Sequence, residues 1–291
     1  MSPAGLTLMS NQLTNTRCLA EACRRLKLPV KSRDENGNLL SVEIGGRRFF
    51  FANYSTPFNS DAVSKIAKDK EFTYRILKDV VPMPRTAGFF DPSYDSVPDR
   101  PKAAFRSVEE ITRSVLDNFS LPVIIKMNSG DRGVNVFLSR SGAEVQNAIG
   151  EIFLKQSRHY DYIALAQDYV PPAREFRAVV FRGRVVLLYE KDFSRAKFVG
   201  NLSPLHWEGA RAVHVADKEA IADFEKLLTP IFSALPVEFS GLDVLEGKDG
   251  RRWLLEMNSQ PGFFYFVRDN GEEPVVRMYE KILTVLLNHK S

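Results

Sequence analysis

The chain has 291 residues, 44% of them hydrophobic, 26% charged and 11% aromatic, which is ordinary for a globular protein and provides enough apolar residues for one large or two to three small domains. Forty Lys and Arg against 36 Asp and Glu give a formal net charge of +4, and the interleaving of the two signs along the chain argues against a nucleic-acid partner. There is no apolar run of about 18 residues and no signal-peptide pattern at the N-terminus, so we expect a cytoplasmic protein with no membrane partner.

The first 60 residues predict a short N-terminal α/β unit. Residues 14–27 have helical spacing, and residues 41–53 read as a hairpin with Gly45 and Gly46 at its turn. Cys18 and Cys23 are five residues apart on the predicted helix, a spacing that suits buried small side chains rather than a disulfide or a zinc site. We predict a domain boundary near residue 60.

The next segments alternate between helices and short strands. Residues 59–80 have helical spacing that ends before Pro82 and Pro84, and the Pro-rich residues 89–105 predict a loop. Ser107 with Glu110, and Ser141 with Glu144, match the capping box that opens a helix. These two helices flank residues 121–139, which predict two strands around a Gly-containing turn.

The last third is rich in predicted strands. Three stretches have strand character, at residues 162–170, 175–192 and 237–258. Two stretches have helical spacing, at residues 217–235 and 272–289. The whole sequence therefore predicts an α+β fold with mainly antiparallel hairpins.

Two acidic residues of the predicted hairpin at 239–258 fall opposite each other. If Asp249 and Gly250 form the turn, Asp243 pairs with Glu256, and Asn258 lies on the same face while Leu255 and Met257 point to the other. Opposed carboxylates repel unless a cation lies between them, and oxygen ligands of this kind suit Mg²⁺ shared with phosphates. The alternative is that these acids are solvent-facing edge residues.

Two lysines and a turn indicate a phosphate site. Lys126 lies within a strongly β-forming run and is followed by a flexible turn whose backbone N–H groups can approach phosphate, although no Walker or GxGxxG pattern occurs. Lys70 follows Asp69 near a predicted helix start, where anions are favoured. Each lysine, taken alone, is more often an ordinary solvated residue.

The order of four stretches resembles the ATP-grasp ligases. They are residues 69–77, 123–136, 166–181 and 241–263, and the resemblance covers about residues 60 to 265. The sequence is most similar to RimK-like glutamate ligases, the central module of cyanophycin synthetase and bacterial glutathione synthetases, and less to D-alanyl-D-alanine ligases. The resemblance implies two α+β subdomains that grip ATP, at residues 61–165 and 166–291.

The resemblance also implies an activity and a set of roles. The activity is ATP-dependent carboxylate–amine ligation through an acyl phosphate, acting on an amino acid or small peptide. Lys70 and Lys126 would bind the phosphates, covered by a lid over residues 129–134 that includes Ser129, Gly130, Gly133 and Val134. Adenine would be bound by Gln167, Tyr169 and Val170, and the ribose by Glu175. Magnesium, expected as two ions with Mn²⁺ as a substitute, would bind Asp243, Glu256 and Asn258, and the acyl phosphate would contact Arg177, Lys191 and Asn201.

Two departures from the family pattern limit these expectations. The unit before Lys70 is shorter than the usual N-terminal domain, and Gly241 stands where D-alanyl-D-alanine ligases carry an Arg, which leaves anion stabilisation to Arg177. Alternative functions are an ATP-grasp kinase acting on a hydroxyl group and a non-catalytic ATP-binding protein. A homodimer is expected from the resemblance.

Overall fold

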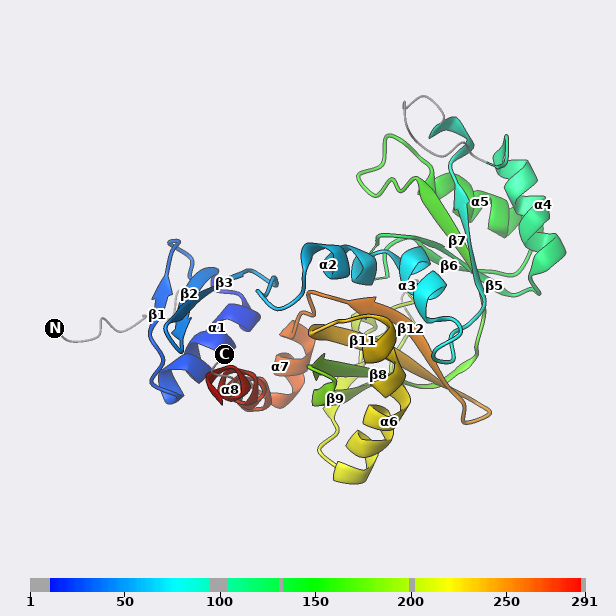
Figure 1. Ribbon diagram of the computed structural model, residues 1–291. Helices are drawn as coiled ribbons and strands as arrows, with labels where there is room; N and C mark the ends of the chain where they lie inside the picture. Colours follow the sequence, from blue (N-terminus) through cyan, green and yellow to red (C-terminus); the bar gives the residue numbers. More distant parts are fainter. Residues whose placement is uncertain (1–10, 95–103, 131–132, 199–201, 289–291) are drawn as a thin grey trace.

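The computed structural model describes residues 11–94, 104–130, 133–198 and 202–288, whose strands form three antiparallel sheets (Figure 1). The first sheet has the order β1-β2-β3, from β1 (Val30–Ser32), β2 (Leu39–Ile44) and β3 (Arg47–Ala52). Gly45 and Gly46 form the β2–β3 turn as predicted, with φ of +57° and +79°. Helix α1 (Thr14–Arg25) packs under this sheet and against the C-terminal helix α8 (Glu273–Asn288).

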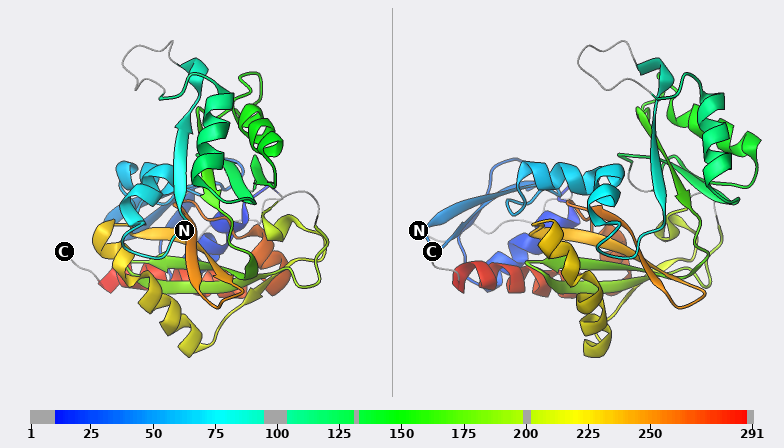
Figure 2. Two further views of the ribbon diagram at one scale, coloured as in Figure 1. Left: turned by 90° about the vertical axis from the view of Figure 1, so that its right-hand side faces the viewer. Right: turned by 45° about the vertical axis from the view of Figure 1, so that its right-hand side comes forward.

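The second sheet has the order β4-β7-β5-β6 and carries two helices on one face. Its strands are β4 (Thr86–Phe90), β5 (Val123–Met127), β6 (Val136–Ser139) and β7 (Ile163–Asp168), covered by α4 (Val108–Asn118) and α5 (Gly142–Ile152). Ser107 and Ser141 cap these helices as predicted, each accepting the N–H of the residue three positions on. Figure 2 shows this part projecting from the rest of the molecule. A short 3₁₀ turn, η1 (Pro92–Tyr94), follows β4.

The third sheet has the order β10-β9-β8-β11-β12 and is the largest of the three. It contains β8 (Pro172–Phe181), β9 (Arg184–Asp192), β10 (Arg211–His214), β11 (Phe239–Gly247) and β12 (Arg252–Asn258). Helices α2 (Asp61–Lys68), α3 (Lys70–Leu77) and α6 (Lys218–Ala234) pack on one face, while α1, α7 (Phe264–Asn270) and α8 pack on part of the other. A 3₁₀ turn, η2 (Pro204–His206), precedes β10.

The helix predicted over residues 59–80 is broken into α2 and α3 at Asp69. Asp69 adopts an extended backbone, φ −92° and ψ 107°, and its carboxylate accepts the N–H of Phe72 at 2.8 Å. Its own N–H closes the last turn of α2. An Asp that competes for a helix N–H favours a cap over a helix interior, so Lys70 becomes the first residue of α3.

The β11–β12 hairpin confirms that Asp243 lies opposite Glu256, but not by the predicted two-residue turn. The last paired residues are Glu246 and Arg252, and four residues, 248–251, separate β11 from β12. A bulge at Leu255 then shifts the register by one, so that Glu256 faces Asp243. The same bulge turns Leu254 into the core with Met257 and leaves Leu255 half-buried, which corrects the predicted placement of Leu255.

One face of the third sheet is divided along its strands into an apolar half and a charged half. The apolar half, at Val179, Phe181, Leu187, Tyr189 and Phe239, packs on α1, α7 and α8. Because side chains alternate along a strand, the same face continues into Glu175 and Arg177 on β8, Lys191 on β9, Asp243 on β11, and Glu256 and Asn258 on β12. Packing of the apolar half against these helices therefore holds in place the same strands that carry the charged residues.

The described residues are organised as the sequence predicts at the level of fold class, since helices and antiparallel sheets segregate as in α+β proteins. Cys18 and Cys23 are free and fully buried in the core beneath the first sheet. No helix in the described part of the chain is both long and apolar enough for a bilayer crossing. The domain boundaries near residues 60 and 165 stay predictions.

Candidate active site

Three buried ionic side chains and the half-buried Arg177 meet on the charged half of the third sheet. Arg177 donates two hydrogen bonds to the carboxylate of Asp243, Nε to Oδ1 and one terminal nitrogen to Oδ2, both at 2.6 Å. Lys191 Nζ bridges Asp243 Oδ2 at 2.8 Å and Glu175 Oε1 at 2.5 Å. The two parallel hydrogen bonds from Arg177 use the planar guanidinium, which Lys does not have. In the whole network two cations balance two carboxylates.

This network determines the protonation of its members. Burial alone would raise the pKa of Asp243, but Arg177 and Lys191 hold it well below its usual range. Burial lowers the pKa of Lys191, but Asp243 and Glu175 outweigh it, so Lys191 stays charged with a raised pKa. Burial raises the pKa of Glu175, against the influence of Lys191. Arg177 and Lys191 are therefore cations at neutral pH, held beside a carboxylate.

Lys70 connects the second and third sheets. Its Nζ lies 3.5 Å from Glu256 Oε2 on β12 and donates to the carbonyl oxygens of Asn128, at 3.3 Å, and Gly130, at 2.5 Å, just after β5. Only about a tenth of the Lys70 side chain is exposed, against 31% for Glu256. Glu256 keeps an accessible carboxylate, and Lys70 places a positive charge between that carboxylate and the loop after β5.

Lys126 is a buried cation on the face of the second sheet that α4 and α5 do not cover. Its Nζ donates to Gln167 Oε1 at 3.0 Å, and the Gln167 amide donates in turn to Thr86 Oγ1 at 2.8 Å. Burial lowers the pKa of Lys126 to about 8, with Glu256 opposing and Lys70 assisting the shift. A buried ammonium with one neutral partner is costly, and an incoming anion would relieve that cost.

The turn after β5 is attached to the rest of the second sheet by a buried carboxylate. Asp161 Oδ2 accepts both the N–H and the hydroxyl of Ser129, each at 2.7 Å, and its other oxygen accepts the N–H of Ile163 at 3.1 Å. The N–H of Ser129, one of the backbone groups of this turn predicted to approach phosphate, is therefore directed to Asp161 in this structure, together with the Ser129 hydroxyl. Gly133 follows with φ of +71° and Val134 is half-buried, while residues 131–132 lie outside the described residues.

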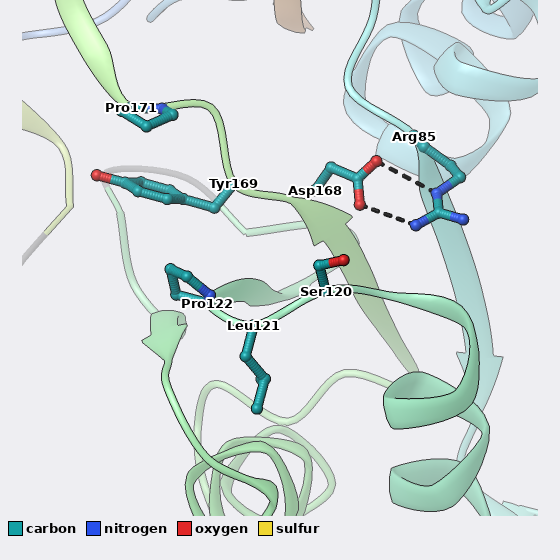
Figure 3. Close-up of a pocket in the computed structure, with 7 residues that line it drawn as sticks. All are labelled: Arg85, Ser120, Leu121, Pro122, Asp168, Tyr169 and Pro171. Atoms are coloured by element: carbon teal, nitrogen blue, oxygen red, sulfur yellow. Dashed lines mark hydrogen bonds and ion pairs between the residues drawn. The ribbon is translucent and has the colours of Figure 1, made fainter.

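The residues predicted to hold adenine lie in the last positions of β7, at Gln167, and directly after it, at Tyr169 and Val170. Gln167 lies in the Lys126 contact, whereas Tyr169 lines a pocket of about 610 Å³ together with an ion pair between Arg85 and Asp168, at 3.0 Å. Figure 3 shows the Tyr169 ring in this pocket, with Pro122 and Leu121 on the neighbouring segment. Val170 lies close to Gly247, where an added Cβ would be 3.3 Å from its side chain.

Comparison with known proteins identifies the family to which this arrangement belongs. Residues 97–282 match the model of the RimK-like ATP-grasp domain, which is more than half of the chain. The chain belongs to the RimK-like ATP-grasp family. A protein named probable alpha-L-glutamate ligase from Psychromonas ingrahamii is 25% identical over 169 residues, covering 56% of this chain and 50% of the relative. The chain thus spans about half the length of the curated relatives it matches.

Solved structures show the same fold at low sequence identity. A RiPP-associated ATP-grasp ligase from Chryseobacterium gregarium, in complex with ADP and a leader and core peptide, has a TM-score of 0.54 at 12% identity and covers 94% of this chain and 92% of its own. A RimK domain ATP-grasp protein from Sphaerobacter thermophilus has a TM-score of 0.53 at 16% identity, covering 79% and 72%. The predicted ATP-grasp fold is confirmed.

The oxygen donors expected to bind magnesium fit a hard divalent cation in chemistry. Asp243 and Glu256 are directly opposed, and Asn258 follows on the same strand with its Oδ1 accepting the N–H of Gln260 at 2.9 Å. Carboxylate and amide oxygens are the ligands Mg²⁺ prefers. Within the described residues, no cluster of three or more His, Cys, Asp and Glu side chains suits a metal ion, so such a site in this RimK-like domain needs the amide and substrate oxygens as well.

Three buried residues that support the site were missed by the sequence reasoning. Asn128 accepts the N–H of Glu71 at 2.9 Å, Asp161 holds Ser129, and Asn15 holds the segment after Asn258. Asn128 lies two residues after Lys126, so strand alternation could have placed it on the same face. Asp161 and Asn15 carry no local signal, because their partners are distant in sequence. The predicted Asn201 lies outside the described residues.

Proposed function

We propose that this protein is an ATP-dependent carboxylate–amine ligase that forms an amide or peptide bond through an acyl phosphate. Two contacts carry the proposal. Arg177 and Lys191 are both ion-paired with Asp243, and the neighbouring Glu256 is linked by Lys70 to the phosphate-site loop of a RimK-like ATP-grasp fold. Relatives of this sequence are named glutamate ligases. The arrangement supplies cations for a polyphosphate and oxygen donors for its metal.

Nucleotide binding is assigned to both sides of the junction between the second and third sheets. Lys126 and Lys70 bind phosphate oxygens, and Gly130, Gly133 and Val134 belong to the segment that covers them after Ser129. Adenine lies beside Gln167, Tyr169 and Val170. Glu175 takes the ribose hydroxyls, which requires that it share its carboxylate between the sugar and Lys191. ATP binding then supplies an anion to the buried Lys126, whose hydrogen-bond partner within the described residues is the neutral Gln167.

Magnesium is assigned to Asp243, Glu256 and Asn258, with two ions expected and Mn²⁺ able to replace them. When bound, the metal neutralises charge on the phosphoryl group during its transfer. Asp243 accepts three hydrogen bonds from Arg177 and Lys191, which keep it ionised at neutral pH and fix its position. Glu256 contributes the more exposed of the two carboxylates.

The reaction proceeds in two steps that Arg177, Lys191 and Asn201 support. A carboxylate oxygen of the substrate attacks the γ-phosphorus of ATP, the bond to the β,γ-bridging oxygen breaks, and ADP leaves. An amine then attacks the acyl carbon, loses one proton, and inorganic phosphate leaves as the amide forms. Arg177 orients the acyl phosphate by contacts to two oxygens, and Lys191 adds a second fixed cation.

The substrate class is an amino acid or a peptide. A glutamate ligase name among the relatives and a bound leader and core peptide in the Chryseobacterium structure both support a carboxylate from a side chain or a chain end. We propose ATP and these substrates as the partners, together with a homodimer and a cytoplasmic location.

The experiment is a screen of amino acid pairs and short peptides with ATP and Mg²⁺, read by phosphate release and mass spectrometry. The expected result is ADP, phosphate and a product whose mass equals the two substrates minus water. Glu256→Gln should abolish turnover with the fold intact, while Glu246→Gln, which removes a carboxylate paired with Arg252 on the same hairpin, should retain it. A phosphorylated product would indicate a kinase, and nucleotide binding with no consumption a non-catalytic protein.

A further inference from the structure

The positive surplus of the chain lies entirely in its N-terminal unit. Residues 1–60 contain eight basic and four acidic residues, whereas the rest of the chain contains 32 of each. The net charge of +4 is therefore a local property of this unit. The rest of the chain balances its cations with its own acids, so the surplus is free to attract an anionic partner to the N-terminal unit.

The outer face of the first sheet gathers part of this charge around an exposed aromatic ring. Ser41 lies between Lys31 on β1 and Phe50 on β3, and Arg33 Nε donates to its hydroxyl at 2.8 Å. Phe50 is 53% exposed, although a Phe of this kind is usually buried. The inner residues of the same strands, among them Phe51, pack into the core.

One acid interrupts this face, and the cations around it outnumber it. Glu43 pairs with Arg48 at 2.9 Å across the hairpin. Arg48, and more weakly Lys31 and Arg33, hold the pKa of Glu43 below its usual value. The three cations and one carboxylate leave a face of net positive charge beside Phe50.

Among the described residues, the edge of the sheet next to Phe50 has no strand paired with it. β3 is the last strand of its sheet, and Ala52 exchanges both backbone hydrogen bonds with Ser55 on the side away from β2. Backbone groups of an antiparallel strand alternate in direction, so Phe50 and Arg48, two and four residues earlier, present N–H and C=O to that same side. No strand in the described part of the chain pairs with them. Such an edge is a template for another strand.

We propose that β3 and the outer face of the first sheet dock an extended acidic polypeptide segment by strand addition. The segment places an acidic side chain against Arg48 and an apolar one, two residues away, against Phe50, because cross-strand neighbours on one face repeat every second residue. Alternating backbone donors and acceptors match a polypeptide rather than a nucleic acid, whose phosphates would use only the cations. This surface is separate from the nucleotide site, and its occupancy does not depend on the ligase reaction.

The test measures binding of labelled seven-residue probe peptides, without ATP, by fluorescence anisotropy. The probe Thr-Glu-Thr-Phe-Thr-Glu-Thr should bind saturably, and its matched control with both Glu replaced by Lys should bind at least about tenfold more weakly. Arg48→Glu and Phe50→Thr should each weaken the acidic probe several-fold. Arg24→Glu, which reverses an exposed charge of the same unit on α1, should leave its affinity within about twofold of the wild type.

A backbone variant separates strand addition from simple charge attraction. Phe50→Pro removes an N–H that faces the open edge and keeps the ladder to β2, since Pro is tolerated at edge positions of this kind. It should lose more affinity than Phe50→Thr, with the fold checked by circular dichroism. The proposal is overturned if the acidic probe fails to saturate up to about 1 mM, if the Lys control binds equally, or if an oligonucleotide binds this face while the probe does not.

Discussion

Asn15 on the first helix donates a hydrogen bond to the carbonyl oxygen of Pro261 at 2.8 Å, although the two residues are separated by 246 positions in the chain. Its other amide atom accepts the N–H of Phe263 at 3.2 Å, and the side chain is buried. The two contacts fall three and five residues after Asn258, the last proposed metal ligand. The N-terminal unit therefore braces the segment that follows the metal site.

We expect Asn15→Ala to raise the Mg²⁺ concentration needed for half-maximal turnover, by about tenfold, and to cost about 2 kcal/mol of unfolding free energy, since two buried peptide groups lose their partners. The matched control is Asn59→Ala. Asn59 holds the start of β11 in the same way, through the carbonyl and N–H of Phe239, and its hydrogen bonds do not reach the segment after Asn258. An equal change of the Mg²⁺ requirement in both variants would mean that Asn15 is only structural.

Arg177→Ala should lower turnover by about a hundredfold and change nucleotide affinity less than about threefold, because Arg177 is assigned to the acyl phosphate rather than to ATP. Loss of affinity alone would contradict that role. The variant should also lose about 3 kcal/mol of unfolding free energy, because it leaves the buried Asp243 with a single cation. Arg182→Ala, which breaks an exposed pair with Glu238, should lose less than about 1 kcal/mol in the same urea titration.

Lys126→Met should stabilise the protein at pH 7 while it abolishes tight nucleotide binding. The pKa of Lys126 falls from an ordinary 10.5 to about 8 on folding, so burying its charge costs on the order of 3 kcal/mol below pH 8. Between pH 8 and 10.5 the unfolded chain holds a proton that the native state has released, so wild-type stability rises with pH relative to the variant. Urea unfolding of both proteins at pH 7, 8, 9 and 10 measures the difference in their unfolding free energies. The prediction would be contradicted by a variant that is less stable than the wild type at pH 7, or by a difference that does not change with pH.

The same group predicts how ATP affinity depends on pH. Bound phosphate favours the charged form of Lys126, so binding above pH 8 must take up a proton, and affinity should fall up to about tenfold per pH unit as pH rises. The weaker ATP binding that remains in Lys126→Met should lack this dependence on pH. Calorimetry in two buffers of different ionisation enthalpy measures the proton taken up.

Asp161→Ala should raise the ATP concentration for half-maximal turnover about tenfold, because Ser129 loses the acceptor of its N–H and hydroxyl. The control is Asp91→Ala. Asp91 is equally buried and accepts the N–H and hydroxyl of Ser93; it lies at the same end of the second sheet as Asp161, beside Tyr162, but its hydrogen bonds do not reach Ser129. Both variants should lose stability, and only Asp161→Ala should change the ATP requirement. A change of equal size in both would remove Asp161 from the site.

The sequence could predict the fold and the opposition of Asp243 and Glu256 because both depend on local rules. Strand alternation and a hairpin fix which residues share a face, and the register was right at these two acids. The bulge at Leu255 could not be predicted from the sequence. It offsets the change of register that the longer loop introduces, and the loop conformation was not known from the sequence. The break at Asp69 was readable in principle, since Asp favours caps.

The supporting contacts of the site could not be predicted for a different reason. Asn15 with Pro261, and Asp161 with Ser129, join elements that only tertiary packing brings together. Arg177 and Lys191 reach Asp243 because β8 lies between β9 and β11 in the sheet. This strand order could not be predicted, because β11 is not the next strand after β9 in the chain. The sequence therefore identified the proposed site residues, but not the residues that form hydrogen bonds and ion pairs with them.

The most direct test of the proposed chemistry follows oxygen from the substrate into phosphate. The protein is incubated with ATP, Mg²⁺ and a pool of amino acids and Glu-containing peptides labelled with ¹⁸O in their carboxylates, and the released phosphate is analysed by mass spectrometry. Ligation through an acyl phosphate predicts one ¹⁸O atom in each phosphate released, with an amide product and no label transfer in Glu256→Gln. Turnover that releases unlabelled phosphate, or that leaves the phosphoryl group on the product, would contradict it.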